Sequence, residues 1–125
     1  MDRQKRILVV DDEPDLTKLI GFQFRAKGFD VQTADDGLQA LQMVHAFKPD
    51  LIILDFVMPD IDGGSLLNLL KAEEATKNTP VIFLTAIASK EDSEENVICG
   101  HYILAKPVPY DKLVQSIEEK LAAGS

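Results

Sequence analysis

The sequence contains a single cysteine, Cys99, among its 125 residues. One cysteine excludes an internal disulfide bond and a zinc site built from several cysteines. It fits a reducing compartment, and we expect the protein to act in the cytoplasm. No apolar run approaches the length of a membrane span, and the four apolar residues at 7–10 are too few for the core of a signal peptide. We therefore expect no membrane insertion.

Basic residues are also scarce, with 13 Lys and Arg against 21 Asp and Glu and a net charge of −8. General nucleic-acid binding needs a basic surface that displaces counterions, so we expect no direct contact with nucleic acid. An acidic chain can instead bind a cation or a basic protein surface. The glycine-rich motifs of dinucleotide folds and of nucleotide phosphate loops are absent too, which argues against both kinds of site.

Short aliphatic runs alternate with helical patterns along the chain. The runs at 7–10, 51–54 and 81–84 show no polar alternation, as is typical of strands covered by helices on both faces of a parallel sheet. Two further strands are predicted at 29–34 and 102–105. Apolar residues recur at helical spacing after four of these strands, which predicts an amphipathic helix after each of the four, and a less regular helix is predicted after the remaining strand.

The strand–helix unit therefore repeats five times within one predicted domain, residues 1–125. The helix between the fourth and fifth strands is the least regular, because Lys90 to Asn96 are polar and acidic and only Val97 and Ile98 follow as apolar residues. This alternation predicts an α/β fold, a doubly wound (βα)5 arrangement with short right-handed connections. Five parallel strands favour the flavodoxin-like strand order 2-1-3-4-5.

Polar residues follow four of the predicted strands at their carboxyl ends. They are Asp11 and Asp12 after the first strand, Asp55 after the third, Thr85 after the fourth and Lys106 after the fifth. The carboxyl ends of parallel strands share one edge of a sheet, and open α/β sheets bind their ligands there. We therefore expect these side chains to converge. Asp35 and Asp36 follow the outer second strand and are interpreted as a helix cap.

Three carboxylates in one pocket repel one another. At about 5 Å and an effective dielectric constant of about 20, each pair costs roughly 3 kcal/mol. Such a cluster needs a cation or a raised pKa, and oxygen ligands without histidine or thiol favour Mg²⁺. A carboxylate nucleophile, a hard cation, a lysine and a hydroxyl together suit phosphoryl transfer, in which positioning and charge neutralisation supply most of the catalysis.

These residues resemble the receiver domain of two-component response regulators, and the resemblance covers essentially the whole chain. The matching motifs are Asp11-Asp12-Glu13-Pro14, Asp55 with Met58-Pro59, Thr85-Ala86 and Lys106-Pro107. One departure is Ile103, which stands where the family commonly carries an aromatic residue, while Tyr102 precedes it.

The resemblance implies that Asp55 is the phosphoacceptor and takes a phosphoryl group from a sensor histidine kinase or a histidine phosphotransfer protein. It implies that Mg²⁺ is bound by Asp12, Asp55 and the backbone carbonyl of Val57, while Asp11 holds a metal-bound water.

Lys106 is implied to pair with the acyl phosphate, and Thr85 to bond a phosphoryl oxygen and couple the site to the surface. A family member of this kind is a signalling switch that assists only its own phosphorylation and dephosphorylation, and is not an enzyme acting on an external product.

Output is expected through the face formed by the fourth helix, the fifth strand and the fifth helix. The partner is a downstream protein or a fused output domain, and phosphorylation-dependent homodimers are a further expectation. No output domain follows the last predicted helix, so the chain is expected to be either a stand-alone receiver or one domain cut from a longer protein.

Two other functions compete with this interpretation. A metal-dependent phosphohydrolase of another α/β family would need a second acid or base beside the nucleophile, where Val57 stands, and an insertion long enough for a substrate cap. A receiver-like module that is never phosphorylated would not need the complete set of acids, lysine and hydroxyl. At single residues, Asp11, Asp12 and Asp15 could instead cap the first helix and favour its dipole, Thr85 could form a turn and Lys106 could be solvated.

Overall fold

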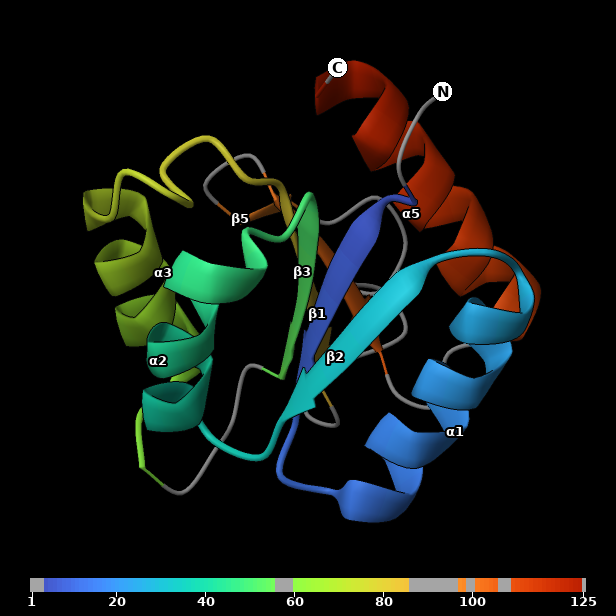
Figure 1. Cartoon of the computed structure of the whole chain (residues 1–125), viewed down its shortest axis with the longest axis horizontal. Helices are drawn as coiled ribbons and strands as arrows, with labels where there is room; N and C mark the ends of the chain where they lie inside the picture. Colours follow the sequence, from blue (N-terminus) through green and yellow to red (C-terminus); the bar gives the residue numbers. More distant parts are fainter. Residues whose placement is uncertain (1–3, 56–59, 86–96, 99–100, 106–108, 125) are drawn as a thin grey trace.

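The computed structural model describes residues 4–55, 60–85, 97–98, 101–105 and 109–124, with the side chains of 85, 97–98, 101–105 and 123–124 left out (Figure 1). The strands are β1 (Arg6–Val10), β2 (Asp30–Ala34), β3 (Leu51–Asp55), β4 (Val81–Thr85), β5 (Val97–Ile98) and β6 (His101–Ala105). The helices are α1 (Pro14–Ala26), α2 (Gly37–Phe47), α3 (Gly63–Ala72) and α5 (Tyr110–Gly124).

The strands form one sheet in the order β2-β1-β3-β4-β6-β5. Five of them, β2, β1, β3, β4 and β6, run parallel, and the two-residue β5 pairs antiparallel to β6 at the edge. Leaving β5 aside, this is the predicted order 2-1-3-4-5, with β6 as the predicted fifth strand. The predicted fold class is confirmed.

Helices cover both faces of the sheet, with α2 and α3 on one side and α1 and α5 on the other (Figure 1). Alternate residues of each central strand point to opposite faces and enter two separate cores. Leu8 and Leu54 pack with Leu66 and Leu70 of α3, while Ile53 packs on the face covered by α1 and α5. The strand that ends in the candidate nucleophile is buried along its whole length, which fixes its position between the layers.

Local signals place the helix starts. Pro14 occupies the first turn of α1, where its missing N–H costs nothing. Asp36 caps α2 through a 2.8 Å hydrogen bond from the Gln39 N–H, which confirms the cap predicted at that position. Asp62 caps α3 in the same way through Ser65. The cap at Asp36 comes shortly after the end of β2, and the cap at Asp62 lies in the connection between β3 and α3.

The predicted helix between the fourth and fifth parallel strands requires a correction at its end. Val97 and Ile98 were expected as its apolar residues, but they form β5 and pair with Tyr102 and His101. Both are β-branched, and a strand accommodates such side chains well. The rest of that prediction, residues 90–96, lies outside the described residues. None of the helices in the described part of the chain combines the length and apolar character that crossing a bilayer requires.

Candidate functional site

Asp55 is the last residue of β3, and Asp11 directly follows β1, its neighbour in the sheet. Val10 aligns with Leu54, so Asp11 and Asp55 occupy equivalent places at the same edge. Both are almost fully buried, with exposed fractions of 1% for Asp11 and 5% for Asp55. Asp12, one residue further along, is exposed. The predicted convergence of these strand ends is therefore observed.

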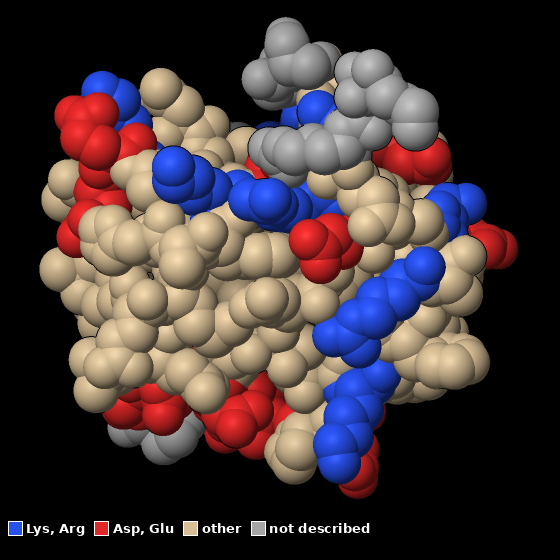
Figure 2. All heavy atoms as spheres, in the orientation of Figure 1, with Lys and Arg blue, Asp and Glu red and all other residues tan. Residues whose placement is uncertain are grey.

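The three carboxylates form a compact cluster. Asp11, Asp12 and Asp55 each offer one oxygen atom, and these oxygens all lie within 4.8 Å of one another. Acidic side chains also gather along the edge at which β1, β2 and β3 end, at the bottom of the view in Figure 2. All three donors are hard oxygens, and one is open to solvent. This donor set fits a hard divalent cation such as Mg²⁺, which keeps several of its waters.

Backbone contacts hold Asp11 in this cluster. Its N–H donates to the Ala34 carbonyl at 3.1 Å and so continues the pairing of β1 with β2 beyond Val10. Its Oδ1 accepts from the N–H of Glu13 at 2.9 Å, which turns the chain toward the start of α1. The same carboxylate thus orders the turn before α1 and contributes an oxygen to the cluster, whereas the N-cap residue of α1 is Glu13, without a side-chain cap.

The position of Thr85 follows from the pairing of its backbone in the sheet. It ends β4 one residue beyond Leu84, the register partner of Asp55, and it aligns with Ala105 at the end of β6. Thr85 therefore lies at the same edge as the carboxylates. Lys106 directly follows Ala105 in the sequence, but it lies outside the described residues, as do Val57, Met58 and Pro59.

Asp60 is a residue of this region that the sequence does not single out. Its carboxylate accepts from the N–H groups of Gly37 at 3.2 Å and Leu38 at 3.1 Å, at the start of α2. Burial acts to raise the pKa of Asp60, but the hydrogen bonds from Leu38 and Gly37 oppose it, and the pKa is lowered. The contact joins residues 23 positions apart, so no local pattern could have indicated it.

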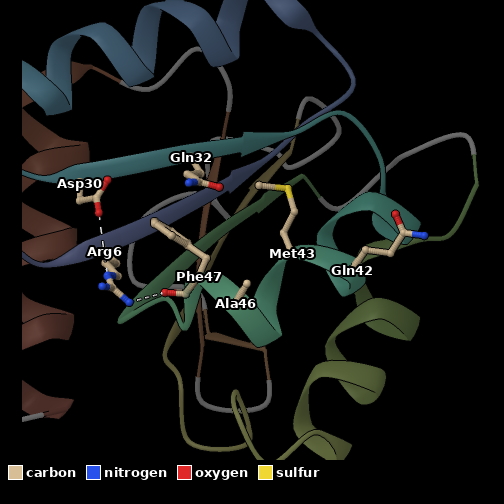
Figure 3. Close-up of a pocket in the computed structure, with 7 residues that line it drawn as sticks. All are labelled: Arg6, Asp30, Gln32, Gln42, Met43, Ala46 and Phe47. Atoms are coloured by element: carbon tan, nitrogen blue, oxygen red, sulfur yellow. Dashed lines mark hydrogen bonds and ion pairs between the residues drawn. The ribbon is translucent and has the colours of Figure 1, made fainter.

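A surface hollow of about 460 Å³ lies at the other end of the sheet, between β2 and α2 (Figure 3). Arg6 reaches across it from the start of β1, and its Nη1 donates to the Phe47 carbonyl at 2.8 Å. Asp30 lies 3.9 Å from the Arg6 Nε. Arg6 is the first residue of β1, whereas Asp11 follows the last residue of that strand. The hollow therefore lies at the opposite end of the sheet from the carboxylate cluster and forms no part of that site.

Comparison with known proteins gives a consistent result. A family model described as "Response regulator receiver domain" matches residues 7–118. The receiver domain of Francisella response regulator 1452 is 32% identical and superposes with a TM-score of 0.83, covering 98% of this chain and 100% of that one. The Thermotoga maritima response regulator TrrA, in a complex with Mg²⁺-BeF, is 29% identical with a TM-score of 0.77, covering 93% and 98%.

Curated relatives are longer than this chain. The Synechocystis "DNA-binding dual master transcriptional regulator RpaA" is 32% identical over 93% of this chain but only 48% of its own length. The Mycobacterium tuberculosis "Transcriptional regulatory protein TrcR" is 35% identical over 96% of this chain and 46% of its own length. The chain thus spans about half the length of these two relatives.

Proposed function

The chain belongs to the response regulator receiver domain family, and on that premise we propose that Asp55 accepts a phosphoryl group and that its phosphorylation controls signalling. The observation that carries this proposal is the cluster of Asp11, Asp12 and Asp55 at the carboxyl ends of two adjacent buried strands. The whole of residues 1–125 acts as one receiver domain.

Three groups of this chain would bind the metal directly, the carboxylates of Asp12 and Asp55 and the backbone carbonyl of Val57. Asp11 would hold a water molecule bound to the metal. Support comes from the all-oxygen donor set within 4.8 Å and from the relative TrrA, whose structure contains Mg²⁺-BeF. When bound, Mg²⁺ supplies positive charge that relieves the repulsion among the carboxylates and stabilises negative charge on a phosphoryl group.

The reaction forms one bond and breaks one. An oxygen of Asp55 attacks the phosphorus atom of a phosphohistidine on the donor protein, and the phosphorus–nitrogen bond breaks. The electron pair stays on the histidine nitrogen, and Asp55 becomes an acyl phosphate. Lys106 pairs its ammonium group with the phosphoryl oxygens, and the Thr85 hydroxyl donates a hydrogen bond to one of them. Water later returns Asp55 to a carboxylate and releases inorganic phosphate.

The donor is a sensor histidine kinase or a histidine phosphotransfer protein. It must contact the surface around the buried Asp55 to deliver its phosphoryl group. Helix α1 starts at this edge, and on its outer face Leu19 and Phe22 are 54% and 73% exposed. Exposed apolar side chains one helical turn apart give a partner protein an apolar contact beside the acidic edge.

Phosphorylation changes partner binding through Thr85 and the face that contains β6 and α5, together with the segment between β4 and β5. The partner is a separate protein or an output domain fused to the receiver, as the greater length of the relatives permits. A homodimer formed on phosphorylation is a further route. In each case the receiver itself touches protein and not nucleic acid, and its chemistry is confined to its own Asp55.

The test is phosphorylation in vitro. Protein incubated with Mg²⁺ and acetyl phosphate should gain one phosphoryl group in an intact mass spectrum, and chelation of the metal should abolish the gain. Asp55→Asn should gain none. Asp35→Asn is the matched control, since Asp35 follows the outer strand β2 at the same edge but lies outside the cluster. Persistent labelling of Asp55→Asn, or catalytic turnover of an added phosphomonoester, would contradict the proposal.

A further inference from the structure

Strand β2 lies at one edge of the sheet, where β1 is its neighbour among the strands that the structure describes. The Asp30 N–H donates to the Lys5 carbonyl at 2.9 Å, so the backbone groups of Asp30 point toward β1. Backbone groups of successive residues point to alternate sides of a strand. Those of Val31 and Thr33 therefore point away from the sheet, and such a free edge is a template for the addition of another strand.

A side chain from helix α1 covers part of this edge. Arg25, in the last turn of α1, donates from its Nη2 to the Val31 carbonyl at 2.8 Å. Val31 is only 3% exposed, although it lies on the edge strand. The outward acceptor of Val31 is thus occupied by a guanidinium group of the same chain.

Gly21 leaves space for this contact. It lies one helical turn before Arg25 and is buried. A Cβ atom at Gly21 would lie 3.2 Å from Nη1 and 3.6 Å from Cζ of Arg25. The guanidinium group therefore lies against the backbone of α1 and reaches the edge of β2 from there.

The other side of the same edge is open. Gln32 is exposed and lines the surface hollow together with Gln42 and Met43 of α2 (Figure 3). On this side an added strand meets a hollow, whereas on the α1 side it meets Arg25. Strand addition at β2 therefore requires that the guanidinium group leave the Val31 carbonyl.

We propose that the free edge of β2 is a self-association surface of this chain and that Arg25 keeps it closed. The partner is β2 of a second copy, which pairs antiparallel about a twofold axis at Gln32. In this register Val31 of each copy lies opposite Thr33 of the other, and each such pair exchanges two hydrogen bonds. One of the two needs the Val31 carbonyl that Arg25 occupies.

The sequence of β2 suits this pairing. Asp30 is the only charged residue of the strand, and it lies opposite Ala34 of the second copy, so that no like charges face each other. A twofold pair closes on itself and does not grow into a fibre. The inference does not depend on the proposed function, because no residue of the carboxylate cluster takes part.

The first test measures self-association by sedimentation, with a chelator and no phosphodonor, so that no dimer depends on phosphorylation. The wild type should be monomeric. Arg25→Ala frees two carbonyls per dimer, and two further hydrogen bonds should raise the association constant about thirtyfold. Arg25→Gln, whose side chain is too short for the contact, should behave in the same way. Lys27→Ala removes a positive charge from the same helix end and should remain monomeric.

A second test locates the contact. In Cys99→Ser protein that also carries Arg25→Ala, Gln32→Cys should form a disulfide between copies on oxidation, because the two positions face each other at about 4.5 Å. Asp30→Cys in the same background should not, since position 30 faces position 34. Thr33→Pro removes an outward N–H without loss to the pairing with β1, and it should return Arg25→Ala to the monomer.

Four results would overturn the inference. A folded Arg25→Ala or Arg25→Gln that stays as monomeric as the wild type would show that Arg25 does not close the edge. Equal self-association of Lys27→Ala would assign the effect to charge at the end of α1. Self-association that persists with Thr33→Pro, or equal disulfide formation at positions 30 and 32, would place the contact elsewhere.

Discussion

Gly37 is the residue at which the start of helix α2 meets the connection from β3. Its φ angle is not in the left-handed region, so its role is steric and not conformational. A Cβ there would lie 2.2 Å from Ile61 Cγ2 and 3.5 Å from Leu66 Cδ2, both parts of a packed core. The nearest neighbour is thus a branched side chain held in place by that core.

Substituting Gly37 by alanine tests this contact. Alanine favours a helix over glycine by roughly 1 kcal/mol, but overpacking typically costs about 2 kcal/mol. We expect overpacking to dominate, so that Gly37→Ala lowers the free energy of unfolding in urea titrations. Gly21→Ala is the control, because its Cβ would meet only the flexible end of Arg25 at 3.2 Å. Greater stability of Gly37→Ala than of the wild type would refute the close packing.

Helix α3 begins at a cap whose strength depends on pH. The Ser65 N–H and the Ser65 hydroxyl both donate to the Asp62 carboxylate, at 2.8 and 3.0 Å. These two hydrogen bonds, first that of the N–H and then that of the hydroxyl, lower the pKa of Asp62 below its ordinary value of 3.8. The folded state therefore binds a proton at this site less readily than the unfolded state does.

The stability that Asp62 contributes is fully present above the unfolded pKa of about 3.8. It is lost as the pH falls through the lowered folded pKa. Asp62→Asn keeps an acceptor for the cap but cannot titrate, so its stability should lack this part of the pH dependence. Urea midpoints of both proteins, measured from pH 6 downward, should differ by a constant amount above about pH 5 and converge at lower pH. A constant difference over the whole range would refute the pKa shift.

Among the elements, those marked by a clear local sequence pattern could be predicted, and those without one could not. Strand β3 could be predicted because its apolar run has no alternation. The cap at Asp36 could be predicted because aspartate before a helical pattern is a strong signal. Strand β5 could not be predicted, because two β-branched residues after a polar stretch show no periodicity. It is held in the sheet by its antiparallel pairing with His101 and Tyr102 of β6.

The same distinction applies to the contacts of the candidate site. The meeting of Asp11 and Asp55 could be predicted, since the parallel order of β1 and β3 forces their carboxyl ends to one edge. The contact of Asp60 with Gly37 and Leu38 could not, since it depends on how one connection folds over the next helix. Topology places strand ends, whereas side-chain contacts between connections require the packed structure.

The whole molecule carries a net charge of −8, with three acidic side chains concentrated at one edge of the sheet. Repulsion within this cluster opposes folding, and a bound cation removes it. A ligand that binds only the folded state stabilises it by about 2.7 kcal/mol at a hundred times its Kd. Metal binding and global stability should therefore be coupled in this protein.

Thermal unfolding of Asp12→Asn tests the coupling, since Asp12 is exposed and its substitution should leave the fold intact. With Mg²⁺ present, the wild type should gain melting temperature, while the variant should gain little. With a chelator, the variant should melt at the same temperature as the wild type or higher, because one repulsive charge is gone. Equal stabilisation of both proteins by Mg²⁺ would place the metal elsewhere.

Phosphorylation of the Asp55 carboxylate can be tested directly by chemical trapping. Borohydride reduces an acyl phosphate to the alcohol, so a phosphorylated aspartate becomes homoserine and can be located by peptide mass spectrometry. After treatment with Mg²⁺ and acetyl phosphate, we predict homoserine at position 55 and at no other aspartate. Homoserine at position 11 or 12, with Asp55 unchanged, would show that Asp55 is not the phosphoacceptor.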